Sequence, residues 1–195
     1  MKIDIILAGV GGQGILSIAA VIGEAALSQG LYMKQSEVHG MSQRGGDVQS
    51  NLRISDQAIH SDLIPTGKAD LVLALEPMEA LRYLSYLSVE GWLVSNSVPY
   101  VNIPNYPDQE RLDVGFSVMK RKVILDVESI AREAGSVRAA NMVLLGAASP
   151  FLKLDYSELE AAVRHIFGRK GEEVVELNLK ALSMGKAIAE QVFKS

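Results

Sequence analysis

The chain has 195 residues, of which 48% are hydrophobic and 22% are charged, and its net charge is −4. This composition is typical of one folded domain covering residues 1–195, and the weak negative charge gives no reason to expect nucleic acid or an anionic membrane as a partner. The absence of cysteine excludes thiolate-held iron–sulfur clusters, cysteine zinc sites and disulfides. With three histidines scattered along the chain, no metal site is expected either.

No apolar run reaches the roughly 18 residues that a membrane-spanning helix needs. The start of the chain, where Asp4 interrupts an apolar stretch, is typical of a strand and not of a signal peptide. We therefore expect a cytoplasmic protein.

The predicted elements begin with a strand that opens at Ile3 and runs into a glycine-rich turn. A helix follows over 15–29, because isoleucines spaced by three and four residues give it one apolar face, and Gly30 suits its C-terminal end. The later elements are expected as strands at 31–36, 48–54, 69–75, 92–95 and 123–127, and as helices at 77–87, 139–149, 156–167 and 172–193.

Strands that alternate with helices predict an α/β fold with an open, mostly parallel, doubly wound sheet of the Rossmann-like type. The residues from 48 to 59, with a polar turn at 55–57, predict an inserted β-hairpin. In such sheets ligands bind beyond the carboxyl ends of the strands. Those ends here are 9–14, 36–46, Glu76 and 96–97, and two of the four are glycine-rich.

The first glycine-rich end contains Gly9, Gly11, Gly12, Gln13 and Gly14, directly between the first strand and the first helix. A phosphate-binding turn requires this order, because glycines let the backbone approach the anion while the helix start offers free N–H groups. The Gln13 side chain would add an uncharged amide donor. The same glycines could instead serve only close packing of strand against helix.

The second glycine-rich end is a polar loop that includes Ser42, Gln43, Arg44, Gly45 and Gly46. Arg44 could bind a carboxylate or a phosphate with two parallel hydrogen bonds, or it could simply pair with Asp47. His39 could act as a general acid or base, although bracing of the loop explains it as well. Glu37 stands where a nicotinamide-binding fold would place its ribose-binding acid. No residue is assigned a catalytic role.

The closing helix at 172–193 carries two apolar stripes. They cover more surface than one sheet face usually needs. A protein partner and burial between the sheet and neighbouring helices explain these stripes equally well.

The chain resembles the gamma-type subunits of 2-oxoacid:ferredoxin oxidoreductases, and within that family it is most similar to the small (beta) subunits of indolepyruvate:ferredoxin oxidoreductases. The resemblance is carried by three segments, at 9–15, at 36–46 with the following 48–54, and at 141–146. The order and spacing of these segments match the family, and the resemblance covers essentially the whole chain.

The resemblance implies a hetero-oligomer in which a large partner subunit holds thiamine diphosphate and the iron–sulfur clusters. The complex oxidatively decarboxylates a 2-oxoacid to an acyl-coenzyme A, reduces ferredoxin, and receives from this chain help in binding coenzyme A and in closing the active site. It also implies that the loop at 42–46 faces the large subunit and that Asn141 supports the same crevice from a helix start. Two alternatives stay open: a stand-alone nicotinamide or flavin oxidoreductase, and a non-catalytic interaction domain.

Overall fold

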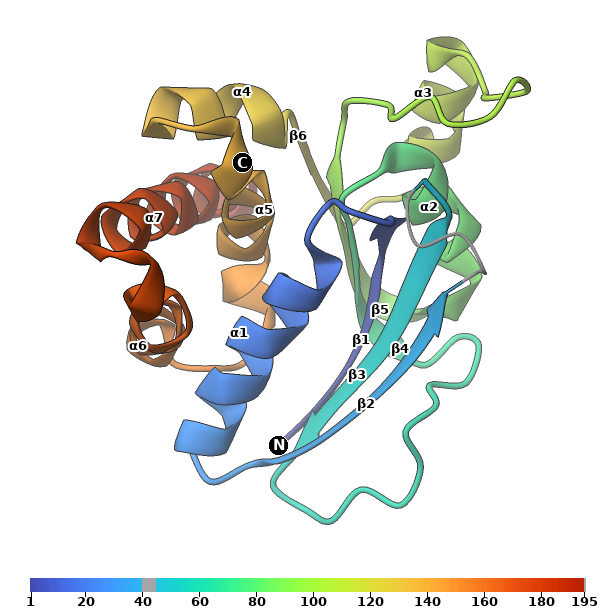
Figure 1. Cartoon of the computed structure of the whole chain (residues 1–195). Helices are drawn as coiled ribbons and strands as arrows, with labels where there is room; N and C mark the ends of the chain where they lie inside the picture. Colours follow the sequence, from blue (N-terminus) through green and yellow to red (C-terminus); the bar gives the residue numbers. More distant parts are fainter. Residues whose placement is uncertain (40–44, 195) are drawn as a thin grey trace.

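A six-stranded sheet forms the centre of the molecule, which is seen here in a computed structural model that describes residues 1–39 and 45–194 (Figure 1). The strands are β1 (Lys2–Val10), β2 (Tyr32–His39), β3 (Asp47–Ser55), β4 (Ala69–Ala74), β5 (Leu87–Asn96) and β6 (Lys122–Leu125). They lie in the order β2-β3-β1-β4-β5-β6. β3 runs antiparallel to both of its neighbours, and the β1–β4, β4–β5 and β5–β6 pairs are parallel.

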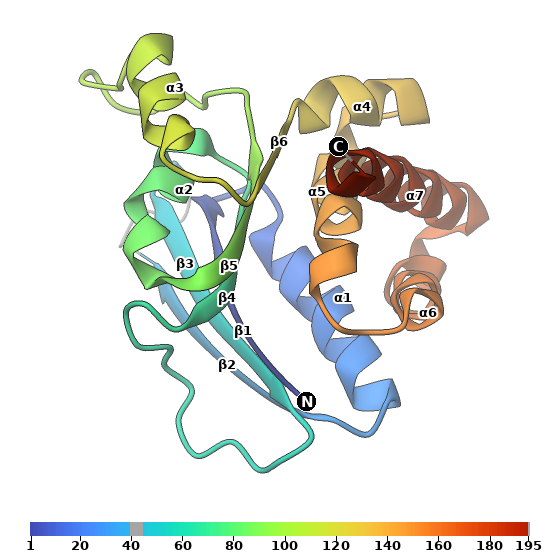
Figure 2. The same cartoon turned by 180° about the vertical axis from the view of Figure 1, so that it is seen from behind.

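Helices cover both faces of the sheet (Figures 1 and 2). One face carries α1 (Ile15–Ser28), α4 (Val127–Ala134), α5 (Ala140–Ala148), α6 (Tyr156–Phe167) and α7 (Glu172–Lys194). The other carries α2 (Pro77–Arg82) and α3 (Gln109–Ser117). Short 3-10 turns complete the chain at η1 (Leu84–Tyr86), η2 (Val137–Ala139), η3 (Ser149–Phe151) and η4 (Gly168–Lys170). The expected α/β fold with a doubly wound, mostly parallel sheet is therefore confirmed.

The core is largest on the face of the five helices. Every residue of β1 after Lys2 is buried, with Ile5 and Leu7 in the larger core and Ile6 in the smaller core beneath α2 and α3. From Asn141 to its end α5 is buried all round, because it lies between the sheet and α7. The apolar stripes of the closing helix are thus explained by burial, since its inner residues belong to the larger core.

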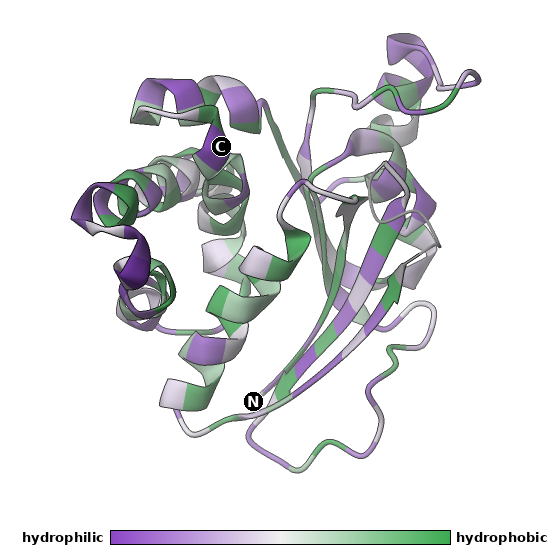
Figure 3. Cartoon of the chain, viewed as in Figure 1, coloured by the Kyte–Doolittle hydropathy of each residue, from purple (hydrophilic) through white to green (hydrophobic). Residues whose placement is uncertain are grey.

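The inserted hairpin exists, but its second arm was predicted wrongly. β3 pairs with β2, and residues 58–59 form no strand. β3 alternates between hydrophobic and hydrophilic residues (Figure 3). Leu52 and Ile54 face the helical core, whereas Asn51 and Arg53 hold the irregular segment 56–68 on the opposite face. Alternation alone predicts a strand and says nothing of which neighbour it pairs with.

Two helices were missed by the sequence analysis, and both begin at an aspartate. Asp108 caps α3 by accepting a hydrogen bond from Arg111 N at 3.0 Å, and Asp126 caps α4 by accepting one from Ser129 N at 2.9 Å. An aspartate at this position supplies an acceptor for a free N–H group of the first turn. The last strand accordingly ends at Leu125, and the helix expected at 77–87 ends at Arg82.

Candidate functional site

The glycine-rich turn joins the carboxyl end of β1 to the start of α1, as predicted. Gly12 and Gly14 have φ angles of +102° and +92°, which L side chains rarely adopt. A Cβ at Gly14 would also lie 2.8 Å from Asn141 Nδ2, whereas a Cβ at Gly12 would meet nothing within 4 Å. The turn is therefore open above Gly12 and closed against α5 at Gly14.

A cavity of about 330 Å³ opens beside this turn, at the carboxyl edge of the sheet. Its lining consists of Gly12, Gln13, Gly14, Leu75, Asn96, Val127, Glu128, Val137, Arg138, Ala140 and Asn141. These residues come from the glycine turn before α1, from the position after β4 and the end of β5, from the start of α4, and from η2 with the start of α5. Neither α1 nor α5 has a side-chain cap at its first residues. Because helix starts carry free N–H groups and a partial positive charge, the cavity suits an anion.

Amide side chains fix the walls of this cavity. Gln13 accepts a hydrogen bond from Val10 N at 2.8 Å and donates one to Leu75 O at 3.2 Å. Asn96 donates to the same Leu75 oxygen and accepts from Val127 N at 3.3 Å, so it joins the end of β5 to the start of α4. Both amides are thus engaged with the protein. The role of Gln13 in binding a ligand stays a prediction, which rests on the second hydrogen of its Nε2.

Asn141 lies at the start of α5 and is 9% exposed. Its Nδ2 donates to Gly14 O at 3.4 Å, across 127 positions of sequence. Within residues 1–39 and 45–194 no group donates to its Oδ1. This contact confirms that Asn141 lies beside the glycine turn, and it leaves polar capacity directed at the cavity.

Two charged side chains line the cavity, and their surroundings differ. Glu128 pairs with Arg132 at 3.1 Å on the surface of α4. Arg138, in η2, makes no hydrogen bond or ion pair through its guanidinium within the described residues. The sequence analysis overlooked Arg138. The sequence feature that could have revealed it is its position one turn before Asn141, the residue that opens the third family-like segment.

The second glycine-rich end lies against the first. Gly11 N donates to Gly46 O at 2.8 Å, and Gly45 N donates to Gly11 O at 3.4 Å. Asn102, from the proline-rich segment after β5, donates to Gly45 O at 2.8 Å. The predicted site residues Ser42, Gln43 and Arg44 lie outside the described residues, as does the side chain of His39.

Gly9 and Gly11 have internal roles in this arrangement. A Cβ at Gly9 would lie 3.0 Å from both Gln13 Oε1 and Ile15 Cδ1, so close packing favours glycine there. The N–H of Gly11 is occupied by Gly46. Ligand contacts from these two glycines stay predictions.

Buried carboxylates lie on the α2 side of the same edge. Glu76 accepts hydrogen bonds from Glu79 N at 2.8 Å, from Tyr100 N at 3.3 Å and from the hydroxyl of Tyr106. Burial raises the pKa of the Glu79 carboxyl, although Arg82 opposes this shift. Burial, together with the hydrogen bond to Glu76, also raises the pKa of Tyr106. These groups anchor α2 and the segment after β5, and they do not line the cavity.

Glu37 lies on β2, and β3 stands between β2 and β1. β2 is therefore two strand spacings from the glycine turn, roughly 10 Å, where a dinucleotide fold has one spacing of roughly 5 Å. This separation argues against a stand-alone nicotinamide enzyme.

A family model described as pyruvate ferredoxin/flavodoxin oxidoreductase matches residues 4–188. The chain belongs to this family. The resemblance inferred from the three sequence segments is thereby confirmed, and the chain is part of an oxidoreductase, as expected.

Relatives within the pyruvate ferredoxin/flavodoxin oxidoreductase family include the indolepyruvate oxidoreductase subunit IorB of Archaeoglobus fulgidus, which is 36% identical over 95% of this chain and 94% of its own. The gamma subunit of a keto/oxoacid ferredoxin oxidoreductase from Geobacter sulfurreducens has the same fold, with a TM-score of 0.70 and 27% identity over 97% of this chain and 99% of its own. A third similar structure is the 2-oxoglutarate:ferredoxin oxidoreductase of Magnetococcus marinus, which was solved with 2-oxoglutarate, coenzyme A and succinyl-CoA bound. The match covers 100% of this chain and 32% of the Magnetococcus chain, with a TM-score of 0.78 and 24% identity.

The described part of the molecule lacks two features. It has no helix long and apolar enough to cross a membrane. It also has no group of three or more histidine, aspartate or glutamate side chains placed to hold a metal ion.

Proposed function

We propose that this chain is the small subunit of a ferredoxin-dependent oxidoreductase that acts on indolepyruvate or a related arylpyruvate. In this complex it helps to bind coenzyme A and closes the thiamine diphosphate site of a large partner subunit. The substrate class is supported by the near-complete match to an indolepyruvate oxidoreductase subunit. The observation that carries the proposed role is the cavity between the glycine turn and the starts of α1, α4 and α5.

The chemistry of this cavity fits the phosphates of coenzyme A. Phosphate oxygens accept hydrogen bonds and carry negative charge, and uncapped helix starts supply donors and a favourable potential. The open space above Gly12 lets an anion approach the backbone. Gly12, Gly14 and Asn141 are the proposed contacts here, and contacts from residues 42–46 are part of the same proposal. Support for this ligand also comes from the Magnetococcus enzyme, in which coenzyme A is bound.

The electron-transfer groups are assigned to the partner. Since the chain has no cysteine, the iron–sulfur clusters that pass electrons to ferredoxin would be held by the large subunit, together with thiamine diphosphate. The thiamine cofactor would supply the decarboxylation chemistry, and this chain would position coenzyme A and exclude water. The expected assembly is a hetero-oligomer, and the cytoplasm is the compartment we propose.

Reconstitution with the large subunit tests this function. The complex should reduce ferredoxin with indolepyruvate only when coenzyme A is added, and the isolated small subunit should be inactive and colourless. The control is the large subunit alone, which should lose coenzyme A-dependent turnover. An isolated small subunit that turns over substrate, or a large subunit whose activity does not change when the small subunit is added, would refute the proposal.

A further inference from the structure

We propose that Arg138 binds a phosphate group of coenzyme A in the cavity beside the glycine turn, and that its charge sets the affinity of the complex for this co-substrate. The inference rests on the proposed function, and it assigns a specific cation to the site.

The position of Arg138 is the first argument. It belongs to η2, which leads directly into α5, and it lines the same cavity as Gly12 and Gly14. A phosphate held by the glycine turn would therefore lie in a cavity that Arg138 borders. Arginine offers planar, paired donors that match phosphate oxygens.

The second argument is that Arg138 has no structural task of its own. Arg53 and Arg82 are each tied to a buried carboxylate, at 2.8 and 2.9 Å. Arg138 contacts no carboxylate within the described part of the chain, and the hydrogen bond that it makes, to Ser136 Oγ, uses its backbone N–H. A side chain free of internal partners breaks no internal hydrogen bond or ion pair when it binds an anion.

The third argument comes from Asn141, one turn further along. It is nine-tenths buried, and one hydrogen of its amide is donated to Gly14 O. The other hydrogen and the oxygen of the same amide remain for a ligand with both donors and acceptors, such as a phosphate beside a ribose hydroxyl. Arg138 in η2 and Asn141 at the start of α5 thus both border the cavity with hydrogen-bonding groups that have no internal partner among the described residues.

The opposing charge is Glu128, the acidic residue of the lining. Its pairing with Arg132 directs its charge toward a cation on its own helix. Glu128 lowers the attraction of the cavity for anions, and the positive charge of Arg138 opposes this effect.

The test uses the assembled complex and the variants Arg138→Ala and Arg138→Lys. The matched control is Arg111→Ala, which removes an exposed arginine from α3 on the opposite face of the sheet. Arg138→Ala should raise the KM for coenzyme A about 10- to 100-fold, the effect of losing one charge-assisted contact. Arg138→Lys should fall in between, because it keeps the charge but not the paired donors. The KM for the 2-oxoacid should stay at its wild-type value in all three variants.

A binding measurement accompanies the kinetics. Calorimetric titration of the complex with coenzyme A should show the same loss of affinity for Arg138→Ala. Dephospho-coenzyme A, which lacks the 3′-phosphate, shows which phosphate Arg138 contacts. If Arg138→Ala no longer weakens binding of this compound, the contact is with the 3′-phosphate. If the loss of affinity persists, the contact is with the diphosphate. Both results support the inference.

The inference is overturned if Arg138→Ala matches Arg111→Ala in both the KM for coenzyme A and the titration, while the wild-type complex uses coenzyme A normally. A wild-type complex with no coenzyme A dependence would instead overturn the proposed function and this inference with it.

Discussion

A methyl group at Gly14 would meet two obstacles at once. The φ angle of +92° disfavours any L side chain, and Asn141 Nδ2 would lie 2.8 Å from the new carbon. Gly12 presents the first obstacle but not the second, since the space above it is empty. Comparing a substitution at Gly12 with the same substitution at Gly14 therefore separates the cost of backbone strain from the cost of the contact with α5.

Gly12→Ala should cost about 1–2 kcal/mol of unfolding free energy, the price of a left-handed residue. Gly14→Ala should cost more, about 2–4 kcal/mol, because Asn141 must also move. Urea unfolding of the isolated chain measures the difference. Equal losses in the two variants would show that the Asn141 contact has no energetic weight.

At the scale of single residues the sequence predicted where the glycine turn and Asn141 lie, while their contacts with a ligand stay predictions. Glycine spacing and its place between strand and helix reflect local backbone geometry, which the sequence contains. The position of Arg138 before Asn141 could be read from the sequence, but its lack of an internal partner within the described chain is revealed only by the arrangement of distant elements. The engagement of the Gln13 amide with Val10 and Leu75 was hidden for the same reason.

Among the elements, the contact between α5 and α7 depends on two further glycines. A Cβ at Gly146 would lie 1.9 Å from Leu182 O, and one at Gly185 would lie 1.9 Å from Val143 O. No rotation of a side chain can relieve a collision between Cβ and backbone, so the helices must move apart.

Gly146→Ala should therefore destabilise the chain by about 2–3 kcal/mol despite the better helix propensity of alanine. The melting temperature should fall by roughly 2–4 °C for each kcal/mol. Gly168→Ala is the control, since Gly168 has an ordinary φ of −53° and free space around its Cα. An unchanged melting temperature in Gly146→Ala would contradict the close packing of the two helices.

Helices were predicted correctly where hydrophobic residues recur with helical spacing, and they were missed where only an N-terminal capping residue marks the helix. The helices ending the chain were found from their apolar spacing, and α6 begins and ends as predicted. α3 and α4 are 9 and 8 residues long, and their aspartate caps at Asp108 and Asp126 carry the information instead. The wrong partner for β3 has a different cause, since strand pairing is set by tertiary contacts.

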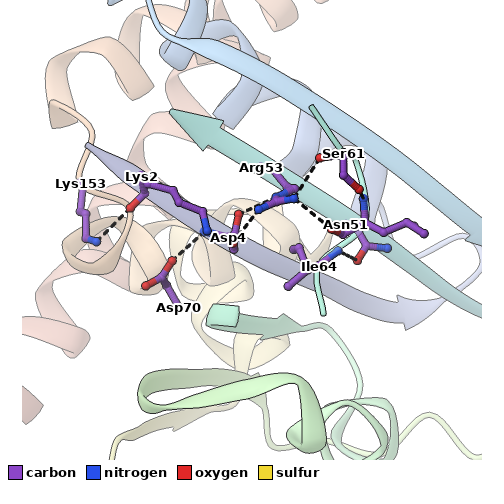
Figure 4. Close-up of polar contacts among 9 residues, drawn as sticks. Lys2, Asp4, Asn51, Arg53, Ser61, Ile64, Asp70 and Lys153 are labelled. Atoms are coloured by element: carbon purple, nitrogen blue, oxygen red, sulfur yellow. Dashed lines mark hydrogen bonds and ion pairs between the residues drawn. The ribbon is translucent and has the colours of Figure 1, made fainter. Parts of the chain in front are cut away.

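Over the whole molecule, the two ends of the sheet have separate tasks. The carboxyl edge holds the cavity, whereas the amino edge is closed by a polar cluster around Arg53 (Figure 4). Arg53 Nε donates to Asp4 Oδ1 at 2.8 Å, and Arg53 Nη1 donates to the carbonyl oxygens of Ser61 and Leu63, each at 3.0 Å. Asn51 Oδ1 accepts from Ile64 N at 3.2 Å. The segment 56–68 thus covers a part of the sheet that α2 and α3 leave open.

Arg53→Met should cost about 3 kcal/mol, because it leaves the carboxylate of Asp4, 1% exposed, with Lys2 as its remaining cation. Proteolysis within 56–68 should accelerate, while the KM for coenzyme A in the complex should not change. Arg164→Met is the control, since its ion pairs with Glu172 and Glu176 lie on the surface and surface pairs contribute about 0–1 kcal/mol. A change in the KM would show that the two edges are coupled.

The ladder between Gly11 and Gly46 also limits how the protein can evolve. It continues the β1–β3 register, in which Val10 faces Asp47, one step past the last strand residues. Adding one residue to the segment at Gly11 or to the segment at Gly46 would move its carbonyl oxygens away from the N–H groups that they face in the other segment. An insertion near Gly11 should therefore be tolerated in descendants of this chain only when the segment around Gly46 gains a matching residue. Changes in length at these two distant places in the gene should then be inherited together.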